Sequence, residues 1–276
     1  MKKSKIIKKS LLTGFIYTVM TCIVQVPIAN IVFSIFNIEP DSFVGENELL
    51  ILLLTIFIVG IAMAIFYYLF GYLFKSKNKL LHGLKFAIFI YAANYIPQVF
   101  FLDATDGFTK LIFGGFPVIQ VELFDLIILI ATVLIMVCYM PYKNIEIGNK
   151  KKSLFKDIVA GIIFSIVLIT VNEFILPLFG FANMADGLNV SKENMLFFYG
   201  VMTIGFMLTG YLVSYFSNKQ NLVNNKNSLC IMFGILIWCV FDLTMIPLGF
   251  GLVPTILFIV VSMISFLVLN IYIKHE

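Results

Sequence analysis

The chain has 276 residues, of which 61% are hydrophobic and only 12% are charged. A soluble domain carries about 25% charged residues, so this composition excludes an ordinary water-soluble protein and predicts a membrane protein. The formal net charge is +4 and all 19 basic residues are lysine. This charge is not typical of a protein that binds nucleic acid, and because bidentate phosphate recognition favours arginine, its absence argues against an enzyme acting on nucleotides or phospholipid headgroups.

Eight apolar segments are long enough to cross the bilayer, since about 20 residues span its hydrocarbon core as a helix. A β-barrel is excluded because the segments lack alternating polar residues. The fold class is therefore predicted to be all-α, a polytopic transmembrane helix bundle of about eight spans. The predicted spans are Leu11–Phe36, Leu49–Phe74, Leu84–Leu102, Val121–Tyr142, Ile158–Phe181, Met195–Phe216, Leu229–Leu248 and Leu252–Ile273.

The lysines predict the orientation of these spans. With eight spans, the basic N-terminus, the 2–3, 4–5 and 6–7 loops and the C-terminal tail all fall on one side, and only Lys110 and Lys192 fall on the other. The positive-inside rule then places both termini in the cytoplasm. The pattern is typical of small bacterial inner-membrane proteins, so we predict a multi-pass protein of the bacterial cytoplasmic membrane.

The two halves of the chain resemble each other. Gly14, Thr18 and Gln25 of the first span recur at identical spacing in the fifth as Gly161, Ser165 and Asn172. Gly71-Tyr72-Leu73 ends the second span, and Gly210-Tyr211-Leu212 lies near the end of the sixth. We predict two parallel four-span repeats, residues 1–149 and 150–276, related by an axis along the membrane normal.

Polar side chains inside the predicted spans are the candidate functional residues, because ionisable groups are costly in a bilayer. At a rise of about 1.5 Å per residue, most of them lie at or beyond the midplane, towards the outside. The acidic candidates are Glu122, Asp125, Glu173 and Asp242, and the neutral ones are Gln25, Asn94, Gln98 and Asn172. Helical spacing puts Asn94 with Gln98, and Glu122 with Asp125, on shared faces.

These residues predict an acidic, outward-facing pocket lined by the first, third, fourth, fifth and seventh spans. Twelve of the 15 carboxylates fall in outer loops or outer half-spans, against two lysines, and an acidic funnel concentrates cations. A desolvated carboxylate can also carry a proton. The alternative is structural, because polar side chains between membrane helices often bond across an interface, for about 0.6 kcal/mol each. Glu122 and Asp125 can also lie simply at the headgroups.

Three functions are consistent with this pattern. The first is a transporter-like protein that binds a small cationic solute, or a proton together with a solute, with Asp242 and Glu173 at the site. The second is a non-transporting accessory, immunity or sensor subunit that pairs with another membrane protein. The third, a membrane-embedded lipid enzyme, has the least support because the sequence contains no nucleophile–base pair or metal-binding motif.

Cofactors are not expected. The four cysteines, Cys22, Cys138, Cys230 and Cys239, have no metal-ligand spacing, and His82 and His275 are the only histidines. We therefore predict a non-enzymatic protein without metal or cofactor. Its expected partners are the lipid bilayer, a small cation or proton, and in the second interpretation another membrane protein.

Overall fold

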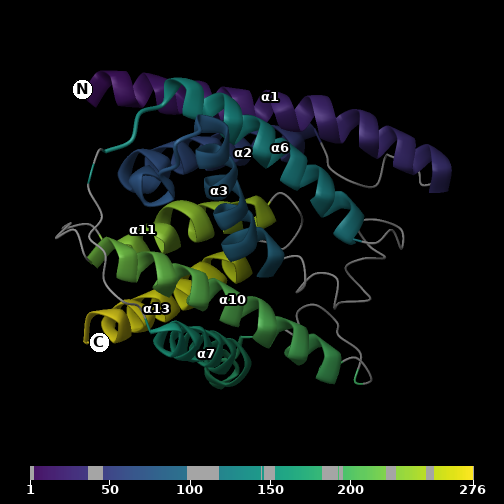
Figure 1. Cartoon of the computed structure of the whole chain (residues 1–276). Coiled ribbons are helices and arrows are strands. Elements are labelled where there is room, and N and C mark those ends of the chain that lie inside the picture. Colours follow the sequence, from purple (N-terminus) through teal and green to yellow (C-terminus); the bar gives the residue numbers. More distant parts are fainter. Residues whose placement is uncertain are drawn as a thin grey trace. The chain divides into compact units, whose positions relative to one another are not determined.

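The computed structural model describes residues 3–36, 46–97, 118–143, 145, 153–181, 192, 195–221, 228–246 and 252–275. These residues form helices and turns, with no β-strand among them (Figure 1). The α-helices are α1 (Lys3–Phe36), α2 (Glu46–Phe70), α3 (Lys79–Ile90), α6 (Val118–Tyr139), α7 (Leu154–Thr170), α8 (Leu176–Leu178), α10 (Met195–Asn221), α11 (Leu229–Phe233), α12 (Val240–Asp242) and α13 (Leu252–His275). Two 3₁₀ turns, η2 (Gly71–Phe74) and η6 (Leu243–Met245), and three π-helical turns, η3 (Tyr91–Tyr95), η4 (Val171–Ile175) and η5 (Gly234–Cys239), adjoin them.

Long apolar helices indicate a multi-pass membrane protein, as the sequence predicts. Within the described residues, five helical segments are long and apolar enough to cross a bilayer: Lys3–Val24, Leu49–Phe74, Leu154–Leu178, Phe198–Lys219 and Leu252–His275. Large apolar side chains are widely exposed on them, including Leu50 at 70% and Phe155 at 72%. Such surfaces are rare on soluble proteins but ordinary in contact with lipid. The count of eight spans, their sidedness and the repeat remain predictions.

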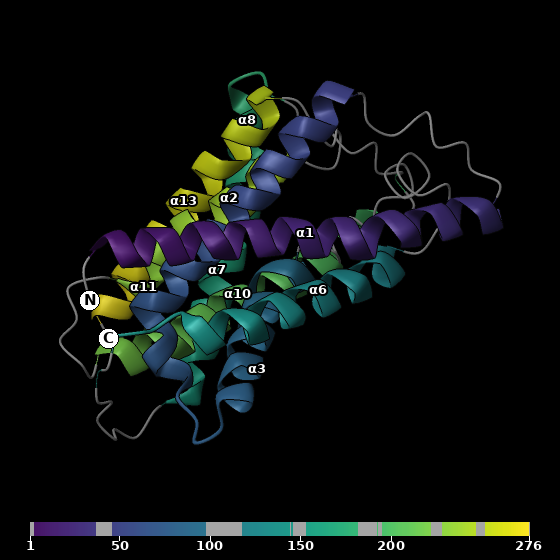
Figure 2. The same cartoon turned by 90° about the horizontal axis from the view of Figure 1, so that it is seen from above.

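Contacts divide the chain into two compact units. The first comprises Met1–Ile88, Val121–Ile145 and Ile235–Ile256. Inside it α1 crosses α2 (Figure 2). The crossing is close because glycines meet there: a Cβ on Gly60 would lie 2.8 Å from the Cα of Gly14, and a Cβ on Gly14 would lie 2.7 Å from the carbonyl oxygen of Phe57. Small residues are what allow membrane helices to approach this closely.

An aromatic cluster joins α2, α3 and the segment after α6 in the same unit. The Tyr67 ring meets the Phe86 ring edge-on at 5.1 Å between centroids. The His82 ring stacks on Tyr142 at 4.9 Å, and the Tyr67 hydroxyl lies 3.0 Å from its Nε2 atom. His82 is only 4% exposed. Burial, and secondarily the charge of Lys85, lowers the pKa of His82 below its usual 6.5.

This histidine predicts a pH dependence of stability. Since the folded protein binds the His82 proton more weakly than the unfolded chain does, the free energy of unfolding should fall as the pH drops through about 6.5. Thermal unfolding at pH 5.5 and 7.5 measures the difference, and His82→Gln should reduce it. His275, which is exposed, is the matched control. An equal pH difference in the wild type and in both variants would contradict the prediction.

The second unit comprises Phe89–Gln120, Glu146–Gly234 and Leu257–Glu276. Here α7 packs along α10, again through glycine: a Cβ on Gly161 would lie 2.5 Å from the carbonyl oxygen of Met207, and one on Gly210 would lie 2.9 Å from the Cα of Gly161. The fully buried ring of Phe266 in α13 meets that of Phe164 in α7 at 4.8 Å between centroids. These contacts position the polar residues of α7 against α10.

Candidate functional site

The structure describes the side chains of five of the eight predicted site residues. Gln98 lies outside the described residues, and Gln25 in α1 and Glu122 in α6 lie where only the helical backbone is described. Asp125 is half-buried in α6, in the first unit. The fully buried Asp242 belongs to the same unit, whereas Asn94, Asn172 and Glu173 belong to the second. Their convergence on a single pocket remains a prediction.

Two of the predicted spans contain a π-helical turn at their polar residues. Asn94 lies in η3, and Asn172 and Glu173 lie in η4. A proline follows both turns, Pro97 in the first case and Pro177 in the second. Single π-helical turns inside α-helices occur frequently at functional sites, because they change the direction of side chains and release backbone groups.

Proline accounts for the wide turn in η3. Pro97 has no N–H to donate to the carbonyl of Ala93, and its ring disfavours the α-helical geometry there. The N–H of Ile96 instead bonds to the carbonyl of Tyr91, five residues back. The released Ala93 carbonyl accepts a hydrogen bond from the Thr209 hydroxyl of α10, at 2.9 Å. The η4 turn follows the same rule, with the N–H of Leu176 bonded to the carbonyl of Val171.

Glu173 is the acidic residue of the η4 turn. It is 7% exposed, and its Oε2 accepts a hydrogen bond of 2.7 Å from the hydroxyl of Tyr199 in α10. Its neighbour Asn172 is 3% exposed and donates through Nδ2 to the carbonyl of Leu168, one turn back. The structure thus places a carboxylate, an amide and a phenol together where α7 and η4 meet α10.

Asn94 is the neutral polar residue of the η3 turn, and it is fully buried. Neither its Oδ1 nor its Nδ2 has a hydrogen-bond partner among the residues that the structure describes. Most buried side-chain amides are satisfied, so such an exception marks a position where water or a ligand would be stabilised. Asn94 follows Ala93, whose carbonyl is bonded to Thr209, so the backbone of η3 lies beside the same helix that carries Tyr199.

Asp242 ends α12 in the first unit, where α12 packs on α2. Its side chain is completely buried. The preceding turn, η5, is the third π-helical segment in the described residues, so π-helical turns contain Asn94, Asn172 and Glu173 and one precedes Asp242. The sequence shows the apolar run around Asp242 but not the π-helical turn, because the widened hydrogen bonding depends on neighbouring helices.

One buried carboxylate was missed by the sequence analysis. Asp157, in the first turn of α7, is 1% exposed and accepts hydrogen bonds from Ser214 Oγ at 2.7 Å and Asn218 Nδ2 at 2.8 Å. A signal was present: Asp157 lies four residues before Gly161 and so extends the polar and small stripe of that helix by one turn. Its location just outside the predicted span hid it.

The described residues contain no group of three histidine, cysteine, aspartate or glutamate side chains placed to hold a metal ion. Comparison of the chain with known protein families, with curated proteins and with solved structures found no match in any of the three. The functional argument therefore depends on the residues themselves.

Proposed function

We propose that this membrane protein is transporter-like and binds a small cationic solute, or a proton coupled to a solute, at carboxylates buried in its spans. The observation that carries the proposal is the burial of two acids, Asp242 and Glu173, within apolar helices. Ionisable residues inside membrane spans are rare and commonly mark ion or proton pathways.

The chemistry follows from the cost of burying charge. An ionised carboxylate is expensive to remove from water, and binding a proton or a cation removes much of that cost. The Tyr199 hydroxyl donates to Oε2 of Glu173, and an arriving proton or cation would compete for the same oxygen atom. Such a carboxylate would bind and release its cargo as the site changes its access to water.

The π-helical turns support a site that changes shape. A turn with an i to i−5 hydrogen bond can shift towards α-helical bonding with a small movement of the chain. The prolines after η3 and η4 leave one carbonyl group of each turn without its α-helical hydrogen bond.

A pairing subunit without transport remains the second candidate. The wide apolar surface of the chain would accommodate another membrane protein, and the experiment below distinguishes the pairing subunit from the transporter.

The test is ligand-dependent thermal stability of the purified protein in detergent, measured against cations, polyamines and amino acids between about pH 5 and 8, where a desolvated carboxylate can titrate. A ligand at 100 times its dissociation constant stabilises the folded state by about 2.7 kcal/mol. Asp242→Asn and Glu173→Gln should abolish the ligand-induced shift, and solute flux in vesicles, while the proteins still fold.

Asp157→Asn is the matched control, because it makes the same change at a buried carboxylate that is already hydrogen-bonded within the second unit. This variant should lose stability but keep its ligand-induced shift. A shift that survives in both Asp242→Asn and Glu173→Gln would refute the site. No shift with any ligand, together with a stoichiometric co-purifying membrane protein, would support the pairing subunit instead.

A further inference from the structure

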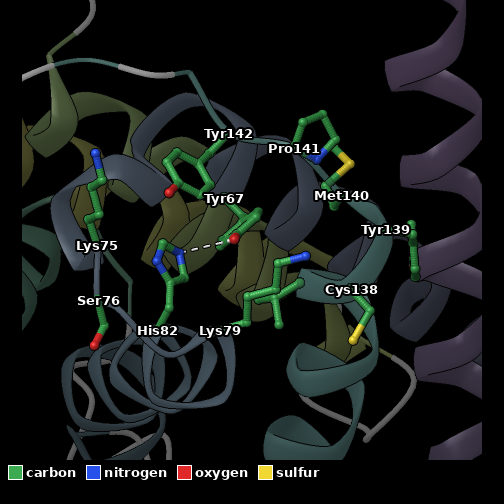
Figure 3. A pocket seen from close by; sticks show the side chains of 11 residues that line it. Tyr67, Lys75, Ser76, Lys79, His82, Cys138, Tyr139, Met140, Pro141 and Tyr142 are labelled. Carbon is green, nitrogen blue, oxygen red and sulfur yellow. Dashed lines mark hydrogen bonds between the residues drawn. The ribbon is translucent and has the colours of Figure 1, made fainter.

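A cavity of about 570 Å³ opens in the first unit, and none of the acidic candidates is among its lining residues (Figure 3). It lies between the turn that joins α2 to α3 and the segment that follows α6. Its volume is within the range of small-molecule sites, about 300–1,000 Å³. It is lined by Tyr67, Lys75, Ser76, Lys79, His82, Val137, Cys138, Tyr139, Met140, Pro141 and Tyr142.

The chemistry of this lining is basic. Two lysines, Lys75 and Lys79, are drawn on either side of the His82 ring in Figure 3, and no lining residue is acidic. Both lysines are exposed, and neither forms a salt bridge with any residue that the structure describes, so their ammonium groups are available to a ligand. Ser76, between them in sequence, adds a hydroxyl.

Local backbone geometry adds to the positive character. Lys79 begins α3, whose N-terminal dipole favours anions, while the Leu80 N–H already donates to Asn78 Oδ1 at 2.8 Å. The C-terminal end of α6 carries the negative end of its helix dipole. This negative charge is offset because the Lys9 ammonium donates a hydrogen bond to the carbonyl of Tyr139. The field inside the cavity therefore favours an anion.

The floor of the cavity is formed by aromatic rings. His82 is held between the Tyr67 hydroxyl, 3.0 Å from Nε2, and the stacked Tyr142 ring. Nε2 is occupied by this contact, while the ring face and edge contribute to a surface on which an organic group can rest. The cavity is much larger than one phosphate ion, so the anion it fits carries an organic part.

We propose that this cavity binds a phosphate monoester, held by Lys75 and Lys79 over the Tyr67–His82–Tyr142 floor. A phosphate monoester carries about −1.5 to −2 charges at pH 7, which matches two ammonium groups, whereas a carboxylate carries one, and lysine serves phosphate as a point charge. The same group occurs free in solution and at the head of a lipid, and the cavity fits either source.

The experiment uses the full chain in nanodiscs. Glycerol 3-phosphate is added to phosphatidylcholine discs for the soluble arm, and dioleoyl phosphatidic acid is built into the discs for the lipid arm. Binding is measured by the shift of the thermal unfolding midpoint and by native mass spectrometry. We expect at least one probe to bind, and Lys75→Gln/Lys79→Gln to weaken that binding at least about tenfold, the loss of a charge-assisted hydrogen bond.

Lys3→Gln/Lys5→Gln is the matched control, because it removes the same two charges at exposed positions outside the cavity. It should leave binding unchanged. Binding of glycerol 3-phosphate supports a soluble ligand, and binding of phosphatidic acid alone supports a lipid headgroup. Absence of binding by both probes, or equal weakening by the two double variants, would overturn the proposal.

Discussion

Gly161→Ala is expected to destabilise the protein by at least about 1–3 kcal/mol, the usual cost of overpacking. The added Cβ would lie 2.5 Å from the carbonyl oxygen of Met207 and 3.3 Å from the amide nitrogen of Tyr211, both of them backbone atoms of α10. Backbone cannot rotate away as a flexible side chain can, so α7 and α10 must separate. The thermal unfolding midpoint and the fraction of monodisperse protein after extraction measure the effect.

The same helix pair provides the control. Gly200 of α10 has no heavy atom within 4 Å of the position that a Cβ would take. Gly200→Ala should therefore leave the unfolding midpoint unchanged or raise it slightly, since alanine is a better helix former than glycine by about 0.8–1 kcal/mol. Equal stability of Gly161→Ala and Gly200→Ala would mean that α7 and α10 do not pack through Gly161.

Asp157→Ala should cost about 1–3 kcal/mol, because it leaves the buried Ser214 hydroxyl without its acceptor and removes the acceptor of the half-buried Asn218 amide. Asp157 also lies in the first turn of α7, where a negative charge is stabilised by the helix dipole. The unfolding midpoint of the purified variant measures the loss.

A double-mutant cycle distinguishes this contact from a general loss of packing. Ser214→Ala alone should be destabilising, and adding it to Asp157→Ala should cost less than the sum of the two single changes, because the two groups are in direct contact. Strict additivity would show that the hydrogen bond between α7 and α10 does not contribute to stability.

Glycine positions show how far sequence patterns extend. The spacing match of Gly14 with Gly161 is accompanied by a shared role, since both glycines lie at a close helix crossing, Gly14 on Gly60 and Gly161 on Gly210. The match of Gly71 with Gly210 is not, because a Cβ on Gly71 would instead meet the Cβ of Tyr142 at 2.8 Å. Spacing identifies small residues, but only the packed helices show which small residues meet.

The sequence by itself determined the class of this protein and the location of the five membrane-length apolar helices that the described residues contain. Local rules are sufficient for this, because about 20 consecutive apolar residues must form a helix in a bilayer. The predicted span Leu49–Phe74 coincides with a helical segment of the same bounds. The ends of the helices differ from the predicted spans: α1 begins at Lys3 rather than Leu11, because lysines extend a helix readily beyond the hydrocarbon.

Only the tertiary structure decided which polar groups meet. Tyr199 lies 26 residues after Glu173, and Ser214 lies 57 residues after Asp157, so no local spacing pairs them. The basic cavity likewise joins a turn after α2 to the segment after α6. Apolar burial favours a helix through residues that are neighbours in the sequence. Hydrogen bonds between helices depend instead on how each helix is shifted along its axis and rotated about it relative to its partner. The separation of two residues in the sequence does not determine this arrangement.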